Sequence, residues 1–164
     1  AVKWVRKSAE QGNAGAQFNM GSMYGDGYGV PQDYELAVEW YRKSAGQGYA
    51  NAQRNLGLMY EIEHGVPKNY ELALKWYRKA VKRYRNSANQ GNANAQKRLG
   101  CMYDKGKGVL KDYVLAYMWF NISAANGNKS GGEYRDIMEE KMTPGQIGNA
   151  QKRAREWMEK HKKK

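Results

Sequence analysis

Apolar residues recur along the chain at the spacing of amphipathic helices, and these helices come in pairs. The first stripe of one pair is formed by Ala16, Met20, Met23 and Tyr24. The second stripe, after a glycine-rich turn, is formed by Leu36, Ala37, Trp40 and Tyr41. Spacings of three and four residues place each stripe on one face of a helix. The sequence therefore predicts antiparallel helix pairs.

The pairs repeat along the chain with a fixed period. Four tryptophans, at positions 4, 40, 76 and 119, are separated by 36, 36 and 43 residues, and glycines, tyrosines and alanines keep the same intervals. A pair of amphipathic helices cannot bury both of its apolar faces alone, so neighbouring pairs must stack. We expect an all-α superhelical solenoid of such pairs, with about nine helices.

The repeat divides the chain into units of one domain, which we expect to cover residues 1–164. The expected parts are an isolated second helix of an incomplete unit at 1–12, a unit at 13–48, a lengthened unit at 49–91, a unit at 92–127, and a divergent C-terminal unit with a capping helix at 128–164. We expect exposed apolar surface at the incomplete first unit. Thr143, Pro144 and Gln146 form a capping-box pattern that opens the last helix.

Some positions depart from simple helix preference. Gly21, Gly57 and Gly100 lie inside the first helices, where glycine costs about 1 kcal/mol relative to alanine. Because this cost recurs in three units, we expect close helix packing that a side chain would block. Glu63 replaces a turn glycine, and Tyr49 stands where other units have an N-capping asparagine, so both turns should be weaker.

The third unit contains seven additional residues between positions 80 and 88. Seven residues turn a helix through about 700°, close to two full turns, so both ends keep their faces. We expect one long helix from about residue 69 to 89.

Positive charge is concentrated in the same region. Of the net charge of +12, most belongs to residues 75–111, which contain eleven Lys or Arg and one Asp. Within it, we expect a basic patch made of Lys82, Arg83, Tyr84 and Arg85, with Tyr84 exposed and able to stack. Such a patch attracts an acidic partner. The alternative is an ordinary solvated helix face.

Catalytic chemistry finds no support in the sequence. His64 and His161 have no cysteine or paired carboxylate at metal-ligand spacing, and Cys101 is the only cysteine. The loop Gly25–Gly29 lacks the Lys-Ser/Thr and the preceding strand of a phosphate-binding loop. We predict no catalytic residue, no metal, no cofactor and no enzymatic activity. No apolar stretch reaches the about 20 residues that span a bilayer.

Several motifs recur in phase and carry a family resemblance. They are Ala-Gln, Leu-Gly, Met-Tyr, Gly-x-Gly-Val, Asp-Tyr, Ala-x-x-Trp-Tyr-Arg-Lys and Gln-Gly, and they cover nearly the whole chain. This succession resembles the Sel1-like repeat of bacterial proteins, a relative of the tetratricopeptide repeat. The resemblance implies a right-handed superhelix, a role as a protein-interaction adaptor, and a bacterial protein exported to the periplasm or secreted.

The resemblance also implies that the first helices of the pairs line a concave groove. Positions of these helices outside the apolar stripes would then face a protein or peptide partner. They are Phe18, Asn19, Ser22, Arg54, Asn55, Leu58, Lys97, Arg98 and Cys101. The alternatives are that these are ordinary surface residues, or that the chain binds an anionic polymer, nucleic acid or glycan, through residues 75–111.

Overall fold

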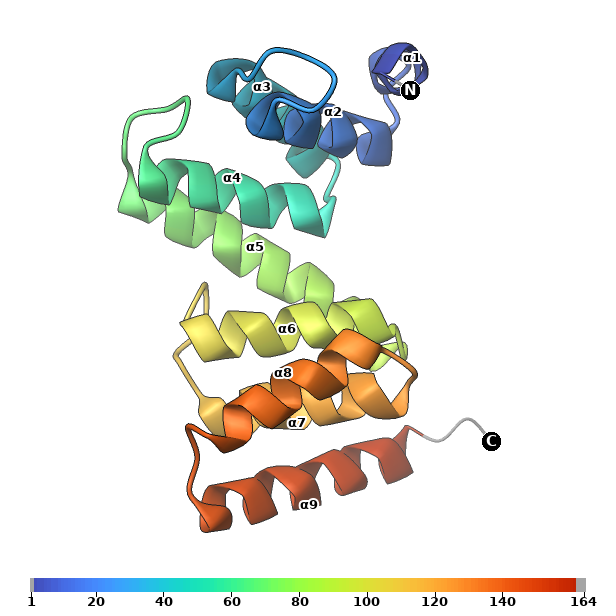
Figure 1. The fold of residues 1–164 in the computed structure, drawn as a ribbon, viewed down its shortest axis with the longest axis vertical. Helices are drawn as coiled ribbons and strands as arrows, with labels where there is room; N and C mark the ends of the chain where they lie inside the picture. The colour runs from blue at the N-terminus through green and yellow to red at the C-terminus, as the bar shows by residue number, and fades with distance from the viewer. Residues whose placement is uncertain (1, 162–164) are drawn as a thin grey trace. The chain divides into compact units, whose positions relative to one another are not determined.

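The computed structural model describes residues 2–161, and these residues form nine helices and no strand (Figure 1). The helices are α1 Val2–Glu10, α2 Ala14–Asp26, α3 Tyr34–Gly46, α4 Ala50–Ile62, α5 Tyr70–Asn89, α6 Ala93–Lys105, α7 Tyr113–Ala125, α8 Lys129–Glu139 and α9 Pro144–Lys160. The prediction of an all-α chain of paired helices is confirmed.

The helices gather into two compact units, Ala1–Arg83 and Tyr84–Lys164. The boundary lies inside α5, so this helix contributes its first part to one unit and its last part to the other. In the first unit α2 packs on α1 and α3, and α3 packs on α4. In the second unit α7 packs on α6, α8 and α9.

Glycine and an aromatic ring meet where the two helices of a pair cross. A Cβ atom placed on Gly21 would lie 2.6 Å from the ring of Tyr41, and one on Gly57 would lie 2.9 Å from Tyr77. In the second unit a Cβ atom on Gly100 would lie 2.7 Å from the ring of Phe120. These distances are shorter than any normal carbon contact, so the expectation that the helical glycines permit close packing is confirmed.

The tryptophans of the repeat are less buried than their place on the apolar stripe suggested. Trp4 is 74% exposed, and Trp40 and Trp76 are half-buried, whereas Trp119 is only 6% exposed. The Lys43 ammonium lies 4.4 Å from the Trp40 ring centroid, so a lysine one turn along covers the outer face of the indole. The placement of the repeat tryptophan on a buried stripe is therefore wrong for Trp40 and Trp76. The exposed Trp4 agrees with the exposed apolar surface expected over residues 1–12.

A buried glutamine joins each first helix to the helix before it. The side-chain nitrogens of Gln17, Gln53 and Gln96 donate to the main-chain oxygens of Ala9, Ala45 and Ala88, at 3.1, 3.2 and 3.0 Å. Each of these carbonyls lies at the end of a helix and also accepts from the main-chain N–H of the turn glycine at 3.0 Å. The glutamine therefore adds a second hydrogen bond at the helix end and joins the next pair to it.

The long helix α5 carries two copies of the same packing pattern. Its first copy places Tyr77 on Gly57, and its second copy, seven residues later, begins at Tyr84. Arg85 then donates to the hydroxyl of Tyr103 at 3.0 Å, as Arg42 does to Tyr60 at 2.9 Å. The predicted helix over about 69–89 is confirmed.

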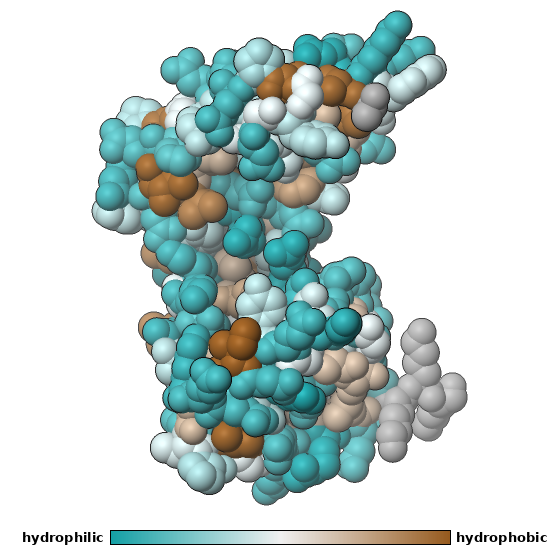
Figure 2. All heavy atoms as spheres, viewed as in Figure 1, coloured by the Kyte–Doolittle hydropathy of each residue, from teal (hydrophilic) through white to brown (hydrophobic). Residues whose placement is uncertain are grey.

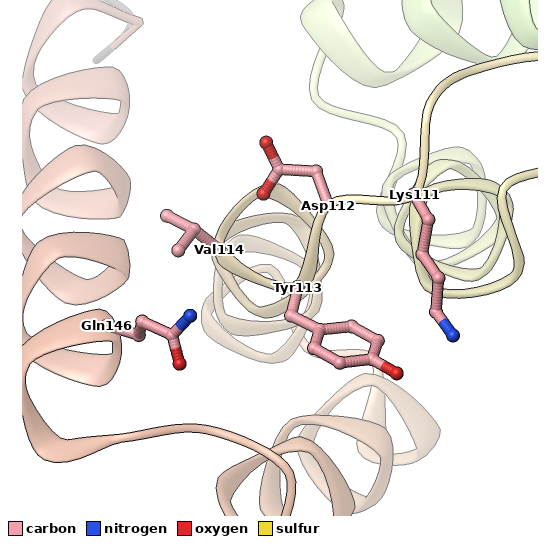
Figure 3. A pocket seen from close by; sticks show the side chains of 5 residues that line it. All are labelled: Lys111, Asp112, Tyr113, Val114 and Gln146. Atoms are coloured by element: carbon pink, nitrogen blue, oxygen red, sulfur yellow. The ribbon is translucent and has the colours of Figure 1, made fainter.

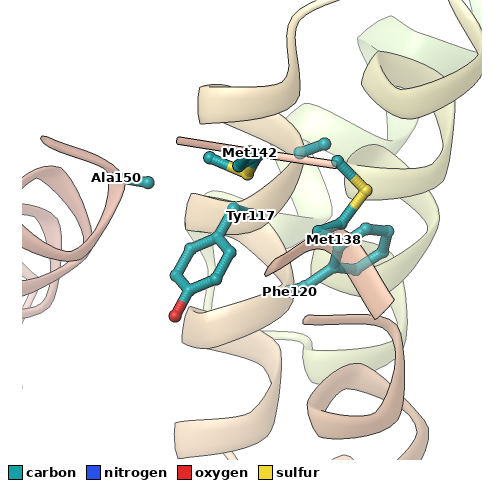
Figure 4. Packing of buried hydrophobic residues seen from close by; sticks show 6 residues of the cluster. Tyr117, Phe120, Met138, Met142 and Ala150 are labelled. Atoms are coloured by element: carbon teal, nitrogen blue, oxygen red, sulfur yellow. The ribbon is translucent and has the colours of Figure 1, made fainter. Parts of the chain in front are cut away.

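The second unit has its own apolar core between α7, α8 and α9. Tyr117 and Phe120 of α7 lie against Met138, Met142 and the α9 helix, and each of these side chains is at most 9% exposed (Figure 4). The last helix opens with the predicted capping box, in which the Thr143 hydroxyl accepts from the main-chain N–H of Gln146 at 3.3 Å. The predicted capping box thus marks where α9 begins.

Two departures from the repeat have the expected effect on the turns. Tyr49 precedes α4 without a side-chain capping bond, whereas Asn13 and Asn92 cap the equivalent helices. Glu63 adopts a φ of 61° at the end of α4, where Gly106 ends α6 with a φ of 65°. The left-handed region costs a side chain about 1 kcal/mol or more.

Alanine has a higher helix propensity than glycine. The contact between Gly100 and Phe120 nevertheless predicts that an alanine at position 100 destabilises the fold. We expect Gly100→Ala to lower the free energy of unfolding by about 1 to 3 kcal/mol, because the new methyl overlaps the ring. The measurement is urea denaturation followed by circular dichroism. Gly148→Ala in α9 is the control, because nothing lies within 4 Å of its Cβ position, and it should be neutral or stabilising. Equal effects of the two changes would contradict the packing argument.

The strained residue at the end of α4 gives a second prediction. Glu63→Gly should raise the free energy of unfolding by about 1 kcal/mol, because glycine adopts the positive φ without a Cβ clash. The reciprocal change, Gly106→Glu, should lower it by a similar amount. Thermal melts of both variants test the pair, and a destabilising Glu63→Gly would show that the carboxylate makes a compensating contact.

Candidate interaction surface

The face shown in Figure 2 is mostly hydrophilic, and its apolar side chains lie in a few separate patches. Large apolar side chains with high exposure are scattered over several helices and turns. They are Trp4, Tyr28, Ile62, Tyr70, Leu74, Leu110, Tyr134 and Ile137. No helix of the described residues is long and apolar enough to cross a membrane.

In the first unit, the Tyr41 hydroxyl brings together side chains from two first helices. Ser22 of α2 lies 3.2 Å from this hydroxyl, and the Asn55 amide of α4 donates to it at 3.1 Å. Phe18 packs on the same tyrosine, with ring centroids 5.8 Å apart, and on Tyr49 at 5.3 Å. Tyr41 itself is 3% exposed, so a buried ring carries a polar tip at the surface.

A second polar contact extends this arrangement along α4. The Arg54 guanidinium donates to the Asn55 side-chain oxygen at 2.9 Å. The Tyr77 hydroxyl donates to the Glu61 carboxylate at 2.6 Å. Burial, followed by the hydrogen bond and charge of Glu61, raises the pKa of the Tyr77 hydroxyl, and the Arg54 charge opposes this increase. The hydroxyl therefore stays protonated and remains a donor.

The structure thus joins most of the sequence-derived residues of the first unit. We call the set Phe18, Asn19, Ser22, Arg54, Asn55 and Leu58 the α2–α4 surface. Asn19 is exposed and the other five are half-buried. Asn19 and Ser22 also line a cavity of about 320 Å³ beside Val5, Met23 and Tyr28.

The corresponding residues of the second unit lie differently. Arg98 of α6 is exposed and Lys97 is half-buried, but Cys101 packs against the apolar core of that unit. The hydroxyl-bearing ring is replaced by Phe120, which stacks on Tyr134 of α8 at a centroid distance of 5.3 Å. No phenolic hydroxyl therefore gathers polar side chains at this position.

The expectation that Tyr84 is an exposed aromatic residue of the basic patch is wrong. Tyr84 is 4% exposed, because it repeats the core position of Tyr77 two turns earlier, so it cannot stack on a nucleic-acid base. Arg85 is held by Tyr103, and Arg83 lies against Gly48. Lys82 is exposed. Arg83 and Arg85 are exposed as well, so all three cations of the expected patch lie at the surface.

Just before two of the second helices, α5 and α7, a lysine lies close to the ring of the tyrosine that begins the helix. The Lys111 ammonium lies 4.9 Å from the Tyr113 ring centroid, and Lys68 lies 5.0 Å from Tyr70. In each pair the tyrosine raises the pKa of the lysine, chiefly through a hydrogen bond. Lys111 and Tyr113 also line an open cavity of about 390 Å³ with Gln146 of α9 (Figure 3).

The two histidines lie on aromatic rings. His64 stacks on Tyr34 at 4.2 Å, and His161 stacks on Trp157 at 4.0 Å, both between ring centroids. Within residues 2–161, no group of three or more His, Cys, Asp or Glu side chains could hold a metal ion.

Sequence reasoning missed the tyrosine hydroxyls and Glu61 as parts of the surface. The sequence pattern placed Tyr41 on the apolar stripe only, and the buried rings of Tyr41 and Tyr77 agree with packing at this repeat position. The available signal was the residue type, since the same repeat position holds Phe120 in another unit and tyrosine is needed there only for its hydroxyl.

Comparison with known proteins places these helix pairs in a family. The Sel1 repeat family model matches residues 1–13, 14–49, 50–83, 93–128 and 145–160. None of the curated proteins compared with the chain matches it.

Two solved structures are similar to the chain. One is a protective antigen present in uropathogenic Escherichia coli strains that displays an SLR fold, at 32% identity and a TM-score of 0.53, covering 98% of this chain and 41% of the antigen. The other is a Sel1 repeat protein from Oxalobacter formigenes, at 34% identity and a TM-score of 0.55, covering 92% of this chain and 60% of that protein. The chain therefore spans about half the length of these relatives.

The role of the Tyr41 hydroxyl is tested by its removal. Tyr41→Phe should lower the free energy of unfolding by about 1 kcal/mol, because Asn55 and Ser22 lose a shared partner while the ring still fills its site. Phe120 shows that the fold accepts phenylalanine at this repeat position. The exposed Tyr28 provides the control, and Tyr28→Phe should change urea denaturation very little. A Tyr41→Phe protein as stable as the wild type would argue against the polar cluster.

Proposed function

The chain belongs to the Sel1 repeat family, and we propose that its α2–α4 surface binds a peptide segment of another protein. Sel1 repeat proteins are generally protein-interaction modules. The observation that carries the finer proposal is the convergence of Ser22 and Asn55 on the Tyr41 hydroxyl, which joins two first helices into one surface.

The chemistry of this surface suits a peptide main chain. A carboxamide donates and accepts hydrogen bonds at once, and Asn19 and Asn55 can therefore pair with both the N–H and the C=O of an extended segment. The half-buried Phe18 and Leu58 offer apolar contacts for side chains of the segment. Arg54 adds a positive charge that favours an acidic residue near the site.

The packing of the side chains also supports the proposal. Arg54 is held by Asn55, and Phe18 is held between Tyr41 and Tyr49, so these groups lose little freedom when a partner binds. Preorganisation of this kind lowers the cost of association.

Selection of binding peptides tests the proposal. Peptides of random sequence displayed on phage are selected on the full chain, and the affinity of the enriched peptides is measured by fluorescence anisotropy. Arg54→Ala and Leu58→Asp should each raise Kd by about tenfold or more, because they remove a charged donor and an apolar contact.

A matched control comes from a second helix of the same unit. Glu39 is exposed on α3, and Glu39→Ala should leave Kd unchanged. Peptides that bind all three variants alike, or a selection that enriches none, would contradict the proposal. A salt titration separates the basic-region alternative, because duplex DNA bound tightly at 50 mM and lost by about 200 mM salt would favour an anionic polymer as the ligand.

A further inference from the structure

A cavity of about 610 Å³ lies in the second unit where three helices end. It is lined by the end of α5 with the following turn, the end of α7 with its cap, and the end of α9. The lining residues are Asn89, Gln90, Gly91, Ala125, Asn126, Trp157, Met158 and His161. We propose that this cavity binds the guanidinium of an arginine side chain from a protein partner.

The same turn occurs twice in the first unit, and there it is filled. The residue 35 positions after each turn glycine reaches back to that turn. For Gly12 the residue 35 positions later is Gln47, whose side-chain amide donates to the Gly12 carbonyl at 2.9 Å and to the Gln17 side-chain oxygen at 2.7 Å. The Gly12 turn therefore receives a nitrogen donor from the following helix.

The second instance shows which group fits such a turn. After Gly48 the residue is Arg83, and a Cβ atom placed on Gly48 would lie 2.7 Å from a guanidinium nitrogen and 2.9 Å from the central carbon. A guanidinium therefore lies directly against the turn glycine.

The third instance leaves the space open. In this turn the residue 35 positions after Gly91 is Asn126, whose side chain is one methylene shorter than that of glutamine. Among the described residues its amide donates only to Gln96, at 2.9 Å. The room that Gln47 and Arg83 occupy in the first unit belongs to the cavity in the second.

The electrostatics of the cavity favour a cation. Helices α5, α7 and α9 all end here, and the carbonyl end of each carries a partial negative charge. The lining contains no Lys, Arg, Asp or Glu, and the one basic residue in the last turn of α9, Lys160, is not among the lining residues. The indole of Trp157 adds an aromatic surface suited to a guanidinium, and Trp119 and His161 hold it in place at 5.4 and 4.0 Å between ring centroids.

The test uses a minimal arginine ligand on the full chain. N-acetyl-arginine methylamide is titrated at 150 mM salt, and the indole N–H signal of Trp157, assigned with Trp157→Phe, is followed by NMR. The arginine ligand should shift this signal with saturation, and the neutral citrulline analogue should bind at least about fivefold more weakly, because it lacks the charge. Equal binding of the two ligands overturns the proposal.

Two variants show whether the ligand takes the predicted place. Asn126→Gln supplies the longer amide of Gln47 to Gly91, so it should raise Kd about fivefold or more while urea denaturation is unchanged or improved. Gln47→Asn, the reciprocal change in the first unit, should not affect the titration of Trp157. Unchanged binding by Asn126→Gln overturns the proposal. The experiment concerns residues outside the α2–α4 surface, so its result is independent of the peptide proposal.

Discussion

The contact between a helical glycine and an aromatic ring determines how closely the two helices of a pair approach. At Gly21, Gly57 and Gly100 the ring of the partner helix occupies the volume that any Cβ atom would take. Helix propensity alone disfavours glycine there, so the sequence accepts a local cost in return for close packing. The buried glutamines can reach the preceding helix ends because the pairs are held at this separation. Stacking of successive pairs thus depends on it.

The lengthened helix α5 shows how the repeat tolerates an insertion. Two extra turns return the apolar face to its original direction, and the packing pattern of Tyr77 begins again at Tyr84. One contact is lost, because the Gln53 side-chain oxygen is buried without a hydrogen-bond partner, whereas that of Gln17 accepts from Gln47. The residue that would supply the donor by repeat position is Arg83, which lies against Gly48 instead. An unsatisfied buried acceptor costs about 1 to 3 kcal/mol.

Periodicity was sufficient to predict the helices, their pairing and the length of α5, because each depends on residue spacing within one repeat. It could not predict the degree of burial of each aromatic residue. Trp76 and Tyr77 are neighbours on one predicted stripe, yet only the tyrosine lies beneath a glycine, and the indole remains half-exposed. For the same reason Tyr84 was assigned to the surface. The polar cluster on Tyr41 was not predicted either, since a hydroxyl at the end of a core ring becomes a functional group only through neighbours on other helices.

Variation among repeats of one chain indicates where binding chemistry can arise. The helical glycine keeps its type at Gly21, Gly57 and Gly100 because packing against the ring requires it. Where a packing residue changes, the interior gains or loses a polar group, as Phe120 does in place of a tyrosine, and the surface above it changes character. Where a bridging residue is shorter, as Asn126 is relative to Gln47, a cavity lies beside the turn. The two proposed sites illustrate both cases, since the α2–α4 surface lies where the repeat tyrosine is kept, whereas the cavity lies where the bridging residue is shorter.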